Sequence, residues 1–202
     1  MRNTNDGANT FAGIRFEVSS NSNTDHYIVQ KKHSGGSGTD LIIGHGSNER
    51  IRFIESGGIT FNGDTAAANA LDDYEEGTYV PTTNSGLTLQ SSYDVFSYIK
   101  IGRCCTVRGL WYPNNNPSGS GAMTMSLPFA SYNYNQIAGA GGSGCMYRLI
   151  SGADYGVVVY VPDNTGTATF YKNGGSGNWS AVTNSNWNNS MEIYVDFTYF
   201  TV

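Results

Sequence analysis

Four carboxylates lie within five residues near the middle of the chain, at Asp72, Asp73, Glu75 and Glu76. Glycoside cleavage needs two carboxylates held about 5–9.5 Å apart in a cleft, and a calcium ion needs several oxygen ligands. The cluster is more typical of an acidic collar, solvated or bridged to a neighbouring subunit, than of a calcium site or a catalytic pair. Because the chain also lacks G-x-S-x-G, H-E-x-x-H and P-loop motifs, we expect no enzyme activity, no catalytic residues and no cofactor.

The three histidines, His26, His33 and His45, all lie in the N-terminal half of the chain. Imidazole is a common metal ligand, and in a trimer a single histidine on the axis would supply three of them. We expect surface or turn positions for these side chains and therefore predict no metal site. A site on a three-fold axis stays open as the alternative.

The three cysteines are Cys104, Cys105 and Cys145. An odd number of thiols with two of them adjacent is a poor disulfide framework, and no zinc-ligand spacing is present. Neighbouring residues of a strand face opposite sides, so one of the adjacent pair is expected to point into the core. We expect Cys105 and Cys145 to be buried as small apolar side chains.

Aromatic side chains near loops offer a different chemistry, because an exposed ring stacks on the apolar face of a sugar while nearby amides bond its hydroxyls. The candidates lie in or beside loops rich in Asn, Gly and Ser: Trp111, Tyr112, Tyr132, Tyr134, Trp179 and Trp187. We prefer Tyr132 and Tyr134, which flank Asn133, and Trp187, which lies among asparagines. The alternative is that these rings belong to a core or to a subunit interface, where aromatic residues are also enriched.

The elements that must position these residues begin with short strands in the first 70 residues. The expected strands are 12–18, 26–32, 41–43, 50–55 and 59–62. An Ala-rich segment at 65–71, with Asp64 as its N-cap, predicts a brief helix. Elements this short bury too little apolar surface to be stable alone. We therefore expect residues 1–70 to form a β-rich stalk in which three identical chains pack around one axis.

An acidic junction at 71–77 is expected to lead into a separate head domain at 78–202. The expected strands of the head are 94–101, 103–112, 122–127, 144–151, 155–161, 167–172 and 190–202. Short strands at this spacing are typical of an antiparallel, jelly-roll-like β-sandwich, so the whole chain is predicted to be all-β. The clean alternation in 190–202 predicts one buried face. The unbroken apolar run at 157–161 predicts a central strand buried on both faces.

Composition excludes several classes of partner. Only 11 of the 202 residues are Lys or Arg and they are scattered, so we expect no nucleic-acid binding. The longest apolar run is far shorter than the roughly 20 residues of a membrane-spanning helix, so no membrane insertion is expected. Residues 1–10 are polar, which predicts no secretory signal peptide and assembly in a cytoplasm.

Four segments carry a likeness to a known group of proteins. They are ERIRFIESGGITFNG at 49–63, ALDDYEEGTYVPT at 70–82, SYIKIGRCCTVRG at 97–109 and MTMSLPF at 123–129. In this order they resemble the distal regions of tail-fibre and related structural proteins of bacteriophages, marine ones especially. The likeness covers about residues 49–130. Tyr79 stands where the group usually has Trp, and the Cys104–Cys105 pair replaces the usual start of its strand.

The resemblance implies a homotrimeric virion protein with a β-rich stalk and a C-terminal β-sandwich, assembled in the host cytoplasm beside other virion proteins. It further implies attachment to host-surface glycans through the head, for which Tyr132, Tyr134, Trp179, Trp187 and Trp111 are the candidate residues. A capsid decoration or head-fibre protein that binds no receptor is the alternative. A depolymerase is a third possibility, which measurable polysaccharide cleavage would reveal.

Overall fold

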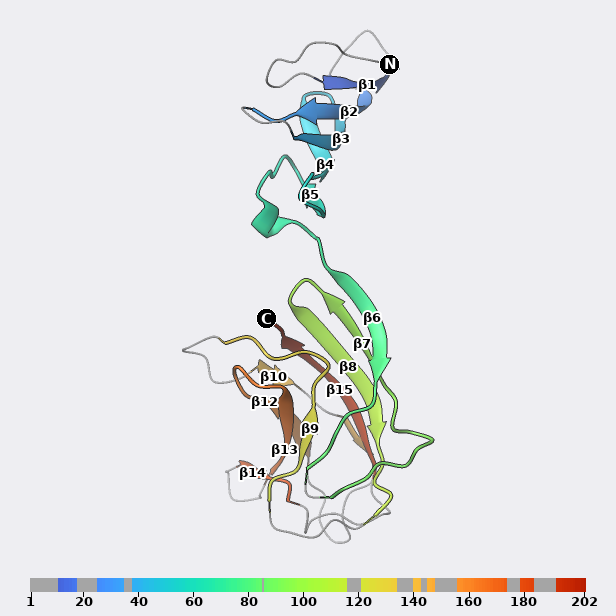
Figure 1. The fold of residues 1–202 in the computed structure, drawn as a ribbon, viewed down its shortest axis with the longest axis vertical. Coiled ribbons are helices and arrows are strands. Elements are labelled where there is room, and N and C mark those ends of the chain that lie inside the picture. The colour runs from blue at the N-terminus through green and yellow to red at the C-terminus, as the bar shows by residue number, and fades with distance from the viewer. Residues whose placement is uncertain are drawn as a thin grey trace. The chain divides into compact units, whose positions relative to one another are not determined.

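In the computed structural model the regular structure of the described residues is almost entirely antiparallel strand, which confirms the all-β class (Figure 1). It divides into two compact units, Met1–Asp73 and Tyr74–Val202. The structure describes residues 11–17, 25–34, 38–84, 86–115, 121–133, 140–142, 145–147, 156–173, 179–183 and 192–202. Two of the predicted site residues, Tyr134 and Trp187, therefore lie outside the described residues.

The N-terminal unit contains one five-stranded antiparallel sheet, here called sheet I, whose strands follow one another in chain order. The strands are β1 (Phe11–Phe16), β2 (His26–Lys32), β3 (Thr39–His45), β4 (Asn48–Phe53) and β5 (Ile59–Phe61). Gly57 and Gly58, in the turn between β4 and β5, have φ of 98° and 93°. Glycine adopts this backbone conformation without the steric cost that other residues have. The sequence placed all five strands within a few residues of these bounds.

The helix predicted at 65–71 was wrong, since only a single 3-10 turn, Ala67–Asn69, forms there. Asp64 still organises the turn, because its carboxylate accepts one hydrogen bond from a backbone N–H two residues on and one from a side-chain amide, both at 2.8 Å. Leu71 instead exchanges backbone hydrogen bonds with Ile59 at 2.8 and 3.0 Å. The end of the Ala-rich segment is thus recruited to the sheet edge, which leaves too few residues for a stable helix.

The second unit, the head, contains two sheets. Sheet II has the strand order β11-β15-β8-β7-β6, and sheet III has the order β10-β12-β13-β14, with β9 also pairing with β13. The strands of sheet II are β6 (Tyr74–Tyr79), β7 (Phe96–Ile101), β8 (Cys104–Trp111), β11 (Cys145–Tyr147) and β15 (Glu192–Phe200). Those of sheet III are β9 (Thr124–Ser126), β10 (Ala140–Gly142), β12 (Val157–Val161), β13 (Thr167–Asn173) and β14 (Trp179–Ala181).

The core of the head lies between these two sheets, so the head is a β-sandwich (Figure 1). Sheet II contributes Phe96 and Val107 among others, and sheet III contributes Val159 and Phe170, all of them fully buried. Strand β15 alternates as its sequence predicted, with every second residue buried. Strand β12 is central in its sheet, but only one of its faces is fully buried and the other is half-buried. Cys105 is buried as expected.

The acidic junction predicted at 71–77 is largely the edge strand β6, which pairs with β7 along its whole length. Two tyrosine hydroxyls donate hydrogen bonds to the carboxylates of this strand. Tyr98 donates to Glu75 at 2.6 Å, and Tyr74 donates to Glu76 at 2.9 Å. Because neighbouring strand residues face opposite sides, these two carboxylates point to different faces of the strand instead of crowding together.

Candidate functional site

Trp111, one of the predicted sugar-binding residues, is fully buried in the head core, where its ring centroid lies 5.0 Å from that of Phe170. It cannot stack on a ligand in this structure, so its assignment is corrected. The physical reason is alternation along β8, since Cys105, Val107 and Trp111 all fall on the inward face. The same alternation, extended by one step to the end of the predicted strand, would have identified Trp111 as a core residue.

Tyr132 and Trp179 are both accessible but do not form one site. Tyr132 is half-buried, and the guanidinium carbon of Arg103 lies 4.5 Å from its ring centroid. Trp179 is 55% exposed in β14 and pairs with Asn173 at the end of β13. Tyr132 accepts a backbone hydrogen bond from Asn164, just before β13 begins. The seven-residue β13 spans about 20 Å, so the two rings are too far apart to share a small ligand.

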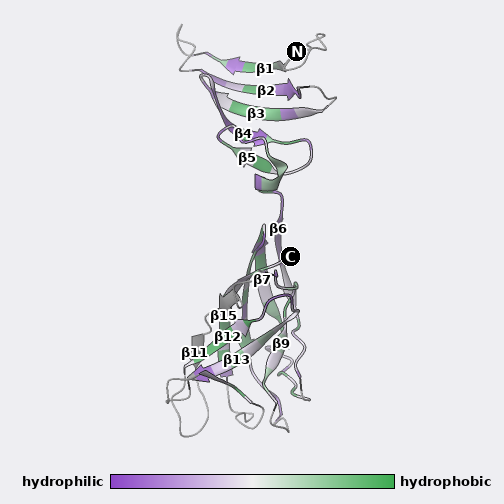
Figure 2. Cartoon of the chain, turned by 90° about the vertical axis from the view of Figure 1, so that its left-hand side faces the viewer, coloured by the Kyte–Doolittle hydropathy of each residue, from purple (hydrophilic) through white to green (hydrophobic). Residues whose placement is uncertain are grey.

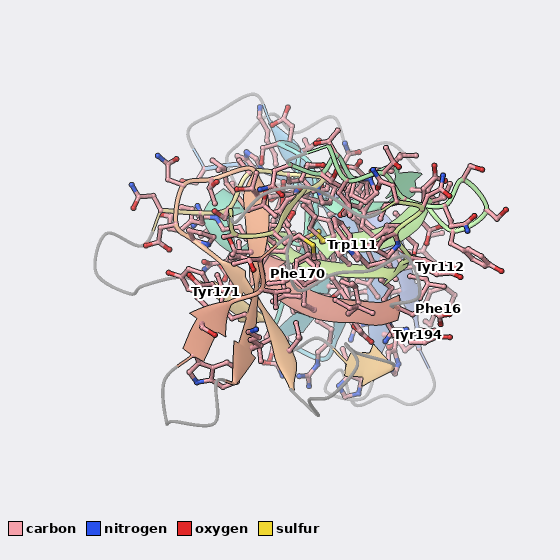
Figure 3. All side chains as sticks on the ribbon, turned by 90° about the horizontal axis from the view of Figure 1, so that it is seen from below. Phe16, Trp111, Tyr112, Phe170, Tyr171 and Tyr194 are labelled. Carbon is pink, nitrogen blue, oxygen red and sulfur yellow. The ribbon has the colours of Figure 1, made fainter. Side chains whose placement is uncertain are left out.

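A different group of aromatic and apolar side chains, three of them exposed and two half-buried, lies on the outer face of sheet II, at the end where β8 stops. We call it the tyrosine patch, and its members are Tyr93, Val95, Leu110, Tyr112 and Tyr194. Tyr93 and Tyr194 are 48% and 49% exposed. The rings of Tyr93 and Tyr112 are 5.7 Å apart between centroids, and Leu110 is the cross-strand partner of Tyr194. Figure 3 shows Tyr112 and Tyr194 pointing to the same side of the head, away from the buried Trp111 and Phe170.

Backbone hydrogen bonds fix the two tyrosines that precede β7 and follow β8. The N–H of Gln90 donates to the carbonyl of Tyr112, and the N–H of Tyr93 donates to the carbonyl of Gln90, both at 2.8 Å. The side-chain oxygen of Asn115 accepts a hydrogen bond from the N–H of Thr88, and its side-chain nitrogen donates one to the carbonyl of Gly86, each at 2.9 Å. The loop that carries Tyr93 is therefore clamped to the segment that carries Tyr112. Tyr93 is not among the candidates named from the sequence, although it continues the alternation of outward-facing residues in β7.

A second exposed apolar surface lies on one face of sheet I. We call it the isoleucine face, and its central row runs in register across all five strands: Ile14, Ile28, Ile43, Ile51 and Phe61. The flanking rows add Phe16, His26, His45 and Asn48 on one side and Ala12, Gln30, Leu41, Phe53 and Ile59 on the other. Ile14 and Phe61 at the two ends of the central row are 56% and 52% exposed. Figure 2 shows the hydrophobic stretches of β3 and β5 that contribute to it.

The opposite face of sheet I carries a buried ion network. The guanidinium of Arg52 bonds both Asp40 and Glu49, and Arg52 and Asp40 are only 5% and 4% exposed. His33 Nε2 lies 2.8 Å from Asp40 Oδ1, which also accepts the backbone N–H of Glu55 at 3.0 Å. Burial raises the pKa of Asp40, but the hydrogen bonds from His33, Arg52 and that N–H outweigh it and hold the pKa below its ordinary value.

A hollow of about 390 Å³ opens beside this network and is lined by His33, Asp40 and Arg52, with Lys31, Lys32 and Thr65 among its other walls. Lys31 Nζ lies 3.3 Å from Glu49 Oε1, so this basic side chain forms an ion pair with an acidic one. We interpret the network as structural. Its charges lie on the face of sheet I that is opposite the isoleucine face.

The histidines do not form a metal centre within the described residues. His26 and His45 are cross-strand neighbours whose ring centroids lie 4.7 Å apart at the edge of the isoleucine face. His33 belongs to the ion network on the other face. Among the residues that the structure describes, no group of three or more His, Cys, Asp and Glu side chains is placed to hold a metal ion.

Comparison of the chain with protein-family models, with characterised proteins and with solved structures finds no match. None of the helices described is long and apolar enough to cross a membrane. Two surfaces thus remain as functional candidates, the isoleucine face of sheet I and the tyrosine patch of the head. Their chemistry has to be argued from their own residues.

Proposed function

We propose that this chain is a homotrimeric appendage or fibre protein of a bacteriophage virion. In this proposal it is not an enzyme, and it attaches to host-surface glycans through its β-sandwich head. The observation that carries the proposal is the isoleucine face, a surface that a lone chain leaves in water. The resemblance of residues 49–130 to phage fibre proteins supplies the biological setting.

The isoleucine face is large enough to hold copies of the chain together. Five strands about 4.8 Å apart and five residues at about 3.3 Å per residue cover roughly 400 Å². Three such faces meeting at an axis bury about 1,200 Å² in total, or about 400 Å² for each of the three pairwise contacts, so the three contacts have to form together. Burying that much apolar surface offsets the loss of freedom that assembly costs.

The composition of the face also favours a second copy over an unlike partner. Its central and flanking rows contain no Asp, Glu, Lys or Arg, so identical faces do not repel one another. Every chain exposes this face, so each copy of the protein meets other copies that carry the same face. Closed cyclic symmetry then covers each face without leaving an unmatched one.

The head, by contrast, closes its own core between sheets II and III. It needs no partner to fold, which leaves its outer surfaces for contact with a receptor. The alternative function, a capsid decoration protein without a receptor, shares the assembly mode and differs only in lacking a ligand at the head.

The native mass tests the assembly. We expect the wild-type protein to have the mass of three chains of 21.8 kDa each. The double variant Ile28→Lys/Ile43→Lys places two charges in the central row and should run as a monomer, because charge burial is unfavourable. Trp179→Lys, an equally drastic change at an exposed site of the head, should remain a trimer. A monomeric wild-type protein would contradict the proposal.

Adsorption tests the attachment. Fluorescently labelled trimer should bind to cells of some members of a panel of marine bacteria. Absence of adsorption, together with symmetric density on a phage capsid, would favour the decoration protein instead.

A further inference from the structure

We propose that the tyrosine patch is a saccharide-binding platform that takes one or two uncharged sugar rings. This inference rests on the proposed attachment function, because it names the ligand class and places it on the outer face of sheet II. Of the sugar-binding candidates named from the sequence, Tyr112 belongs to the patch, whereas Tyr132 and Trp179 do not.

The side chains of the patch suit a sugar. Tyrosine rings offer a flat apolar face together with a hydroxyl, which matches a pyranose, whose C–H groups lie on one face and whose hydroxyls project outward. The rings of Tyr93 and Tyr112, with centroids 5.7 Å apart and planes tilted by 51°, adjoin one another and together make one apolar surface. Val95, 57% exposed, and Leu110 complete the apolar floor. The clamped loop keeps Tyr93 and Tyr112 in place before a ligand arrives, which lowers the entropic cost of binding.

The patch is too small for a protein partner. Its residues come from three adjacent chain segments, which cover roughly 14 by 10 Å, or about 140 Å². A stable protein interface needs about 800 Å² on each side. A polar band formed by Arg108, Asp196, Thr106 and Thr198 crosses β8 and β15 next to the patch and limits its extension. An area of this size fits a mono- or disaccharide.

The charges beside the patch point to a neutral ligand. Arg108 Nε lies 3.1 Å from Asp196 Oδ2 in the cross-strand position next to Leu110 and Tyr194. The pair carries no net charge, and both side chains are well exposed. A guanidinium and a carboxylate side by side offer donors and acceptors to adjacent sugar hydroxyls. An acidic sugar would have to compete with Asp196 for the same guanidinium.

The test is a glycan array of neutral and acidic oligosaccharides probed with the labelled full-length trimer. We expect the wild-type protein to bind neutral members. Tyr93→Ala and Tyr112→Ala should each weaken that binding by about tenfold, as expected when a stacked ring is lost. Tyr112→Phe keeps the ring and should retain most of the binding, which separates loss of stacking from misfolding.

Two exposed aromatic residues elsewhere on the head serve as matched controls. Tyr74, 63% exposed at the far end of sheet II, and Trp179, 55% exposed in sheet III, should tolerate Ala with no loss of array binding. If Trp179→Ala abolishes binding while Tyr112→Ala does not, the inference is wrong and the ligand lies on sheet III.

The remaining outcomes separate this inference from the attachment function. A trimer that adsorbs to cells but binds no saccharide on the array, or binds only acidic ones, overturns the inference and leaves attachment standing. A trimer that binds neither cells nor saccharides overturns both and favours the decoration protein.

Discussion

The isoleucine face and the tyrosine patch are both exposed apolar surfaces on antiparallel sheets, yet their chemistry differs. The first is built on a row of isoleucines, has no Asp, Glu, Lys or Arg in its central and flanking rows, and extends over five strands. The second is aromatic, lies beside the exposed Arg108–Asp196 ion pair and covers three segments. From extent and composition we infer that different kinds of partner suit the two surfaces. A wide apolar face without charged residues suits a protein, whereas a small aromatic patch with polar neighbours suits a small polar ligand.

The substitution with the largest expected effect on this contrast lies in the ion network on the opposite face of sheet I. Asp40→Asn removes one partner of the buried Arg52, and loss of one partner of a buried ion pair costs about 3 kcal/mol or more. Hydrogen exchange should show lower protection across β3 and β4, with the head unchanged. The native mass should fall as the sheet loses its shape. Unchanged exchange in the N-terminal unit would mean that the network does not support the face.

Acid should produce a related effect of intermediate size. The hydrogen bonds that hold the pKa of Asp40 below its ordinary 3.8 stabilise the folded state above the unfolded pKa. That stability is lost as the pH falls from about 4 through the folded pKa. We expect the protection factors of sheet I, which correct for the slower intrinsic exchange in acid, to fall over this range in the wild-type protein. Asp40→Asn is the control, because it lacks the titrating group and should show less dependence on pH there.

The sequence predicted the parts of this contrast that depend on periodicity. The strands of sheet I and the buried face of β15 follow from alternation, which needs only neighbouring residues. What it missed depends on contacts that are distant along the chain. Strand β6 is held by its pairing with β7 and by Tyr98 bonded to Glu75, and an acidic sequence gives no local sign of either.

The two surfaces also differ in how much of each depends on local pattern and how much on contacts that are distant along the chain. The sequence predicted the strands of sheet I, but only the register revealed that their isoleucines form a single continuous row. The tyrosine patch needs three segments whose closeness depends on the pairing of β8 with β15 and on the Gln90 turn. The prediction for Trp111 was wrong because the residue lies near a loop but still follows the alternation of β8, which turns it into the core.

The smallest expected effect concerns the ion pair beside the patch. Asp196→Asn breaks an exposed pair, and such pairs contribute about 0–1 kcal/mol, so thermal stability should hardly change. The variant leaves Arg108 with an unneutralised charge next to Tyr194, which should attract carboxylate-bearing sugars. We expect array binding to shift toward acidic oligosaccharides by a few-fold while neutral members are still bound. An array pattern identical to that of the wild-type protein would show that the pair does not contribute to selection, and that the rings alone determine which sugars bind.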